Sequence, residues 1–374
     1  MSEFIAGVRT MIGLELRQRV RGAAWYVLLG IFFVVLLIVT GLAVLGAGFS
    51  GPSGGMVYSI VTFVVLLMAS LVTPALSGGA INGDRDAATL APVQVTLLST
   101  AQIVGGKFLA AWLTGLSFLV VGAPFMIFAA IVGAQRVNTT VRYAPYTPTA
   151  DLVSATGVSP LTVIASLAVL VIEVGVVAAV GVGLSGIISR PVLSVVTAYL
   201  VIAALSVGTL IAFGLGGSAV ASTATTTSRS IEWDPQTGQP TADPPECGPW
   251  QTSQYRSPRY DLVWGFLAAN PYVIIADATP MTFSSDGYAV DLFSQISSTV
   301  RVMQKPPILE RTYDDCAVFT SQNSPSMREQ VEGTVPSWFV GLGIHLLLAA
   351  GALWWAIART RTPSRRLPRG TRIA

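Results

Sequence analysis

Apolar residues gather in long blocks along this chain. Six blocks are almost entirely apolar: residues 23–47, 57–76, 102–132, 161–188, 192–215 and 337–358. A helix needs about 20 apolar residues to cross the roughly 30 Å hydrocarbon layer of a bilayer. Each block reaches that length, so the pattern predicts six transmembrane helices. The expected fold class is therefore an all-α polytopic membrane protein.

The composition and the positions of the basic residues predict an orientation. The 374 residues are 52% hydrophobic and 11% charged, with a mean hydropathy of +0.65, values that soluble domains of this size rarely show. A cytoplasmic N-terminus puts 13 of the 22 Lys and Arg residues in short cytoplasmic segments, where such residues accumulate. Both termini are therefore expected in the cytoplasm, at the cell (plasma) membrane. The net charge of +3 reflects this topology, and no nucleic-acid partner is expected.

Two polar flanks frame the six blocks. Residues 1–22 place apolar side chains at helical spacing among four arginines, which predicts an amphipathic helix in the cytoplasmic interface of the membrane. A cleaved signal peptide is the alternative, but the apolar run that follows exceeds a typical signal core. The basic tail, residues 359–374, either contacts the anionic inner leaflet or is an ordinary positively charged flank. The apolar residues of the N-terminal flank are Phe4, Ile5, Val8, Met11, Ile12 and Leu16.

The longest polar region is an insertion of 120 residues, 217–336, between the fifth and sixth blocks. It is expected outside the cytoplasm, where an oxidising compartment lets a disulfide persist. It holds both cysteines of the chain, Cys247 and Cys316, and a disulfide between them is predicted. A pair of buried free thiols is the alternative. A second outer loop is expected at residues 133–160.

Part of the insertion, residues 260–280, contains an apolar run at 262–275 that is broken by Asn270 and Pro271. Its 14 residues fall short of the roughly 17 that a transmembrane helix needs. A seventh crossing would also move the arginines of the tail out of the cytoplasm. The run is therefore predicted to be a re-entrant or interfacial pair of helices, with a buried core helix of the outer domain as the alternative.

Motifs that carry chemistry are scarce. A phosphate-binding loop needs an upstream glycine and a hydroxyl residue after its lysine, and Gly105-Gly106-Lys107 lacks both. His345 is the only histidine, so metal sites and histidine-dependent hydrolase sites are not expected. Neither a cofactor nor an enzymatic activity is expected in this chain. Any energy would have to come from a separate subunit or from an ion gradient.

Two ionisable residues lie within predicted transmembrane helices. Glu173 is near the middle of the fourth and is a functional candidate, because a charge in the membrane is costly. The alternative is a protonated Glu173 that hydrogen-bonds between helices. His345 lies about eight residues into the sixth. It could approach Glu173, although the two depths differ by several ångströms, and a packing role is the alternative.

A polar stretch, residues 83–107, separates the second and third blocks within a loop predicted to cover residues 78–107. Its opening cluster of acid, base and acid consists of Asp84, Arg85 and Asp86. Pro92 is expected to end a short helix. Ser99 and Gln102 have the spacing of a capping box. The stretch therefore predicts a short helix, a break and a capped helix on the cytoplasmic side.

This stretch resembles the signature of type-2 ABC transporter permeases, the six-span membrane subunits of ATP-driven exporters. The match covers about 25 residues without gaps, and the six-span architecture, the N-terminal helix and the insertion also agree with that family. Ala88, Ala91 and Leu97 depart from it, where Gly, Glu and Pro are usual. The matched residues at the start of the third helix are Ile103, Val104, Gly106 and Lys107. The ATPase-coupling residues that the resemblance implies are Asp84, Arg85, Asp86, Thr89, Leu90, Gln94, Thr96 and Ser99.

The resemblance implies transport without chemistry in this chain. The polar stretch would dock on a separate ABC ATPase, two copies of which would bind ATP and Mg²⁺ and move two permease chains, identical or homologous. The apolar helices favour a hydrophobic or amphipathic cargo, exported from the cytoplasm or the inner leaflet of the bilayer. The alternative is an ATP-independent membrane anchor or scaffold that displays a disulfide-stapled outer domain in the cell envelope. An ion-coupled carrier would need membrane charges beyond Glu173.

Overall fold

The computed structural model describes residues 2–50, 54–86, 98–136, 158–232, 247–284, 286–314 and 325–360. Within these ranges, six helices are long and apolar enough to cross a membrane. We call them spans one to six, and each agrees to within a few residues with one predicted apolar block. They are α2 (Ala23–Ser50), α3 (Gly54–Ser77), α6 (Thr100–Arg136), α7 (Pro160–Ile187), the run α8-η2-α9 described next, and α14 (Trp338–Thr360).

Span five is one helix with a wider turn near its middle. It runs as α8 (Pro191–Ala203), the π-helical turn η2 (Ala204–Gly208) and α9 (Thr209–Ala219). A π-helical turn shifts the hydrogen-bond register and leaves backbone groups that need other partners, and such turns are frequent at functional sites. Only 11% of its most apolar stretch is buried, so span five is covered less by the rest of the chain than any other span.

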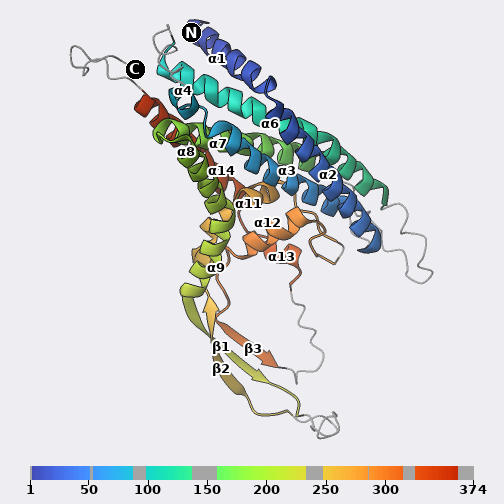
Figure 1. The fold of residues 1–374 in the computed structure, drawn as a ribbon. Coiled ribbons are helices and arrows are strands. Elements are labelled where there is room, and N and C mark those ends of the chain that lie inside the picture. The colour runs from blue at the N-terminus through green and yellow to red at the C-terminus, as the bar shows by residue number, and fades with distance from the viewer. Residues whose placement is uncertain are drawn as a thin grey trace.

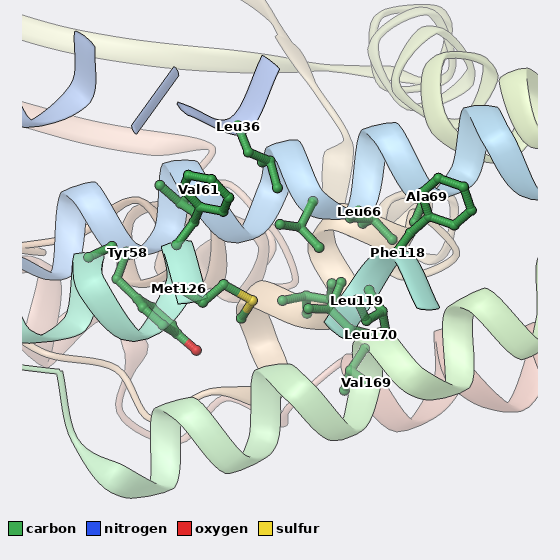
Figure 2. Close-up of a cluster of buried hydrophobic side chains, with 14 of the residues drawn as sticks. Leu36, Tyr58, Val61, Leu66, Ala69, Phe118, Leu119, Met126, Val169 and Leu170 are labelled. Atoms are coloured by element: carbon green, nitrogen blue, oxygen red, sulfur yellow. The ribbon is translucent and has the colours of Figure 1, made fainter. Parts of the chain in front are cut away.

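Spans two, three and four enclose the main core of the bundle. Figure 2 shows their side chains converging, with span one closing one side of the cluster. Because lipid is as apolar as these side chains, close packing rather than exclusion of water stabilises the contacts. The labelled residues are Leu36, Tyr58, Val61, Leu66, Ala69, Phe118, Leu119, Met126, Val169 and Leu170.

Small residues let spans four and six approach closely. Gly183 and Gly186 of α7 face Ala352 and Ala356 of α14. A Cβ built at Gly183 would lie 2.6 Å from Ala352 Cβ, and one at Gly186 would lie 2.7 Å from Ala356 Cβ. These distances are shorter than carbon atoms tolerate, so the helices could not pack this closely if the glycines carried side chains.

The N-terminal helix α1 (Ser2–Val20) packs against the start of span three (Figure 1). Gln102 Nε2 donates a hydrogen bond to the backbone oxygen of Phe4 at 3.2 Å. Met11 lies on Gly106, where a built Cβ would be 2.5 Å from Met11 Cβ. The predicted N-terminal helix is confirmed, whereas its place at the membrane surface stays a prediction.

A pair of short helices, α10 (Trp264–Ala268) and α11 (Pro271–Ala278), turns at Asn270. The Asn270 side chain caps α11 by accepting a hydrogen bond from Tyr272 N at 2.9 Å. Pro271 takes the first helical position, where its missing N–H costs nothing. The predicted helix pair, called the α10–α11 hairpin below, is confirmed as a structure. The other short helices of the insertion are η3 (Tyr260–Leu262), α12 (Leu292–Val302) and α13 (Met327–Val331).

The insertion also contains a β-sheet, so the fold is mostly helical, as predicted, but not all-α. The strands β1 (Ala221–Arg229), β2 (Gln251–Pro258) and β3 (Glu310–Asp314) form a sheet of order β2-β1-β3. β1 pairs antiparallel with β2 and parallel with β3. The sequence ASTATTTSR of β1 is rich in threonine, whose branched side chain favours strands. Because α9 continues to Ala219, the insertion begins after that residue rather than at Gly217.

The bundle has two distinct ends (Figure 1). At one end lie α1, the end of α14 and the short helix α4 (Asn82–Asp86), which follows span two. The sheet projects from the opposite end. We call these the α4 end and the sheet end.

Several predicted features lie outside the described residues. They include most of the loop at 133–160 and nearly all of the tail at 359–374. Cys247 forms a β-bridge with Ile231, but Cys316 lies outside the described ranges, so the disulfide stays a prediction. The coupling residues outside them are Thr89, Leu90, Gln94 and Thr96.

Candidate functional site

A buried ion-pair cluster joins three helices at the α4 end. Lys107 of α6 has no exposed side-chain surface, and its Nζ lies 2.7 Å from Asp84 Oδ2 of α4. The same ammonium group contacts the carboxylate of Glu15 in α1. Taking a lysine out of water is costly unless its charge is paired. Two carboxylates around one ammonium supply that pairing and fix α1, α4 and α6 relative to one another.

Helix α4 is also fastened to the end of span four. Ser185 Oγ accepts hydrogen bonds from the backbone N–H groups of Ile81 (2.9 Å) and Asn82 (3.1 Å). Arg85 Nη2 donates to the backbone oxygen of Gly186 at 3.3 Å. A movement of α4 would therefore act directly on spans three and four.

The structure places the predicted coupling residues as follows. Asp84 and Arg85 turn toward the bundle, whereas Asp86 is exposed. The capping box is confirmed, because Ser99 N donates to Gln102 Oε1 at 2.6 Å and Gln102 N donates to Ser99 Oγ at 3.3 Å. Lys107, predicted both as the end of the polar loop and at the start of the third helix, lies within α6, which begins at Thr100.

Glu15 is the residue of this cluster that sequence reasoning missed. It lies among the arginines of α1, with Arg19 Nη2 at 4.0 Å, and that spacing of four residues reads as an ordinary helix-surface pair. The signal that could have found it is the position of Lys107, a basic residue inside an apolar helix that needs a carboxylate partner.

A second polar site lies inside the bundle, between spans four and six. His345 Nδ1 lies 2.8 Å from Glu173 Oε2 and 3.0 Å from Glu173 Oε1. Their side chains are 1% and 2% exposed. His345 Nε2 lies 2.9 Å from the backbone oxygen of Ala269, at the end of α10. The expected difference in depth does not keep the two residues apart, because they are hydrogen-bonded to each other between spans four and six.

The polar contacts continue from the α10–α11 hairpin to span five. Asn270 Nδ2 donates to Ser206 O at 2.6 Å and to Thr209 Oγ1 at 2.9 Å. Ser206 belongs to η2 and Thr209 follows it. The asparagine amide therefore donates to the backbone of the π-helical turn itself. The turn of the hairpin thereby bridges span five on one side and spans four and six on the other.

Asp277 fastens the other end of the hairpin. Its Oδ1 accepts from Ser297 Oγ and Arg301 Nε of α12, both at 2.6 Å. Its Oδ2 accepts from Ser337 Oγ at 2.9 Å, from the Ser337 backbone N–H and from Trp338 N at 3.1 Å. These two N–H groups begin span six, so the carboxylate serves as the cap of that helix. Sequence reasoning missed Asp277 because a lone Asp in a short helix carries no motif.

An apolar groove of about 790 Å³ runs beside span five. Its walls come from α3, span five, α11 and α12, and nearly all of the lining is apolar. A much smaller cavity of about 20 Å³ touches Glu173 and His345. The two cavities share the lining residues Ser70, Ile202 and Tyr272. Among the described residues, no group of three or more His, Cys, Asp or Glu could hold a metal ion.

No protein-family model matches this chain, and no curated protein sequence matches it. The class that the fold defines is a mostly helical chain with six candidate membrane-spanning helices, as expected of a multi-pass membrane protein.

Proposed function

We propose that this chain is the permease subunit of an ATP-driven ABC exporter. The observation that carries the proposal is the attachment of α4. This short polar helix between spans two and three is fixed to α1, span three and span four by Lys107, Ser185 and Arg85. A force applied to α4 would therefore reach several spans at once. Such an attachment suits a part that receives force from another protein.

The proposed drive is a separate ABC ATPase that docks at the α4 end, on the cytoplasmic side. Asp86 is the exposed member of the acid-base-acid cluster and would contact the ATPase, while Asp84 and Arg85 hold α4 in place. ATP and Mg²⁺ would be bound by the ATPase, so this chain supplies the path and not the hydrolysis. Two ATPases and two permease chains, identical or homologous, would make the complete exporter.

The proposed cargo is hydrophobic or amphipathic. The groove beside span five is large enough for such a molecule and presents few polar groups, and ligand pockets of this kind commonly have volumes of about 300–1,000 Å³. Asn270 and Ser70 lie in its wall as isolated polar groups. A sugar or an ion would need many more hydrogen-bond partners than this lining provides.

A second candidate is an ATP-independent membrane anchor that displays an outer domain. The observation that favours it is the sheet, which projects from the bundle at the sheet end (Figure 1). In this alternative the Cys247–Cys316 disulfide would stabilise the displayed domain, and α4 would be an ordinary connection. The attachment of α4 to three other helices favours the exporter.

Purification of the full-length chain from its own membranes tests the proposal. We expect a chain with a phosphate-binding loop to co-purify and to hydrolyse ATP. The variant Asp86→Arg should weaken this co-purification by roughly tenfold, because it reverses an exposed charge at the contact. Arg17→Ala, an exposed change on α1 at the same end, is the matched control and should have no effect. Absence of any ATP-hydrolysing partner after mild cross-linking would favour the anchor.

A further inference from the structure

The hydrogen bonds of His345 determine how many protons the intramembrane pair holds. The backbone oxygen of Ala269 can only accept, so His345 Nε2 must carry a hydrogen. Nδ1 lies within 3.0 Å of both oxygens of Glu173, and that contact needs a hydrogen on either the ring or the carboxyl group. Both arrangements contain the same two protons and have no net charge. Every state with fewer protons places two lone pairs against each other, and the state with one more proton carries a net positive charge.

No other charge in the neighbourhood compensates for the loss of the shared proton. Among the described residues, Lys107 and Asp277 are each paired elsewhere, with Asp84 and Arg301. The tyrosines bond to neutral oxygens or line the small cavity. The titratable side chains on the elements packed around the pair are Tyr58 of α3, Lys107 of α6, Tyr199 of α8, Tyr272 and Asp277 of α11, and Arg359 of α14. Deprotonation would therefore leave one net negative charge among apolar helices, which is costly.

A small cavity lies beside the pair. Its volume, about 20 Å³ next to Glu173 and His345, is comparable to the roughly 10–15 Å³ that one water molecule needs by this measure. It shares the lining residues Ser70, Ile202 and Tyr272 with the larger groove. The pair therefore lies close to the groove.

We propose that Glu173 and His345 form a proton-binding site that fastens the α10–α11 hairpin to spans four and six. With the shared proton bound, His345 holds the Ala269 carbonyl and Glu173 holds His345. When the proton leaves at higher pH, the imidazole can no longer donate to both partners, and the hairpin loses this attachment. The proposal goes beyond the exporter function and does not depend on it.

Glutamine at position 173 separates the proton from the hydrogen bond. The amide of Glu173→Gln can donate to Nδ1 of a neutral His345 or accept from Nδ1 of a protonated one, while Nε2 still donates to Ala269, so the attachment persists without the carboxyl group. This variant imitates the proton-bound site at every pH. His345→Ala removes the attachment at every pH and imitates the released hairpin.

The test is hydrogen–deuterium exchange of peptides covering residues 264–278, in the full-length chain in lipid nanodiscs, from about pH 5 to pH 9. The exchange rate of the wild type is divided by that of Glu173→Gln at the same pH. This ratio removes the intrinsic chemical exchange rate, which changes with pH equally in both proteins. We expect a ratio near one at acidic pH and a rise of roughly tenfold at alkaline pH, the effect of losing one charge-assisted hydrogen bond. His345→Ala should exchange fast throughout. Peptides from β1 and β2 are the internal control and should keep a ratio near one.

A ratio that stays at one across the whole range would overturn the proposal, because the wild-type attachment would then be independent of the proton. A constant ratio other than one would also overturn it, since the effect of replacing Glu173 by glutamine would then not depend on pH. The measurement needs no ATPase, so its outcome is independent of whether the chain is an exporter.

Discussion

Gly341 of span six lies directly against the backbone carbonyl of Ala268 at the end of α10. A Cβ built at Gly341 would be 1.8 Å from that oxygen. Ser337 and His345 lie four residues to either side, on the same face of the helix, and both also contact the α10–α11 hairpin. The hairpin is therefore held along one face of span six by the capping carboxylate of Asp277, a close backbone contact and the imidazole of His345.

The close contact predicts that Gly341→Ala destabilises the chain. An added methyl group must push the hairpin away from span six, and overpacking of this severity costs about 3 kcal/mol. Gly343→Ala is the matched control on the same helix, because nothing lies within 4 Å of a Cβ built there. It should be neutral or slightly stabilising, since alanine favours a helix over glycine. Thermal unfolding of the purified chain in nanodiscs checks both, and equal midpoints would refute the contact.

Asp277→Asn should loosen the start of span six. Asparagine keeps only one acceptor oxygen, so either the N–H groups of Ser337 and Trp338 or the donors of α12 lose their acceptor, and Arg301 loses its counter-ion. Breaking a buried, hydrogen-bonded pair of this kind costs about 3–5 kcal/mol. Asp286→Asn, at an exposed position of the insertion, is the control. The measurement is unfolding in nanodiscs together with the protease sensitivity of the segment before span six. Equal behaviour of the two variants would show that Asp277 is dispensable.

The long apolar spans and the helix ends were predictable from the sequence because their signals are local. A block of 20 or more apolar residues has few alternatives to a membrane span. Ser99 and Gln102 form their capping box with the backbone of the same helix turn. Asn270 and Pro271 break a helix wherever they occur in this order, so the hairpin followed from two residues.

The features that sequence reasoning missed depend on contacts between distant segments. Glu15 and Lys107 are far apart in the chain, and only the packing of α1 on α6 brings them together. Asp277 meets its partners across the insertion in the same way. The strands were missed for a different reason. β1 is rich in threonine rather than alternately apolar, and its pairing with β3 joins segments that lie some 80 residues apart.

Lys107→Met should destabilise the α4 end. The carboxylates of Glu15 and Asp84 would then face each other without the ammonium group between them, although the Asp84 side chain is 30% exposed and water relieves part of the repulsion. We expect a loss of about 3 kcal/mol, at the low end for a broken buried pair. Lys305→Met provides the control, because the other lysine of the chain is exposed in the insertion. Adding Glu15→Gln to Lys107→Met should restore part of the stability, and failure to do so would argue against charge as the cause.

The pair of Arg259 and Asp261 at the base of the sheet predicts a dependence on acid. Hydrogen bonds from the Arg259 guanidinium, at 2.8 and 2.7 Å, lower the pKa of the Asp261 carboxyl. A lowered pKa in the folded state stabilises the fold above the unfolded pKa of about 3.9, and that stabilisation is lost as the pH falls below it. Protection of residues 251–262 from hydrogen exchange should therefore exceed that of Arg259→Gln at about pH 6, and the difference should shrink as the pH falls below about 4. Arg256→Gln, on the exposed strand β2, should follow the wild type, and a constant difference between wild type and Arg259→Gln would exclude the carboxylate as its source.

The groove beside span five predicts where a hydrophobic molecule binds. Ala203 and Val207 lie in its wall, so the double variant Ala203→Trp and Val207→Trp should fill part of the volume. Leu200 and Ile211 are exposed on the same span outside the groove, and their double substitution by Trp is the matched control. A photoactivatable fatty acid should label α12, on the opposite wall of the groove, in the wild type and in the control. We expect roughly threefold weaker labelling of α12 in the first variant, because bulky side chains take up space that the probe needs. Equal labelling of α12 in both double variants would show that the groove is not the binding site, whether or not an ATPase drives the chain.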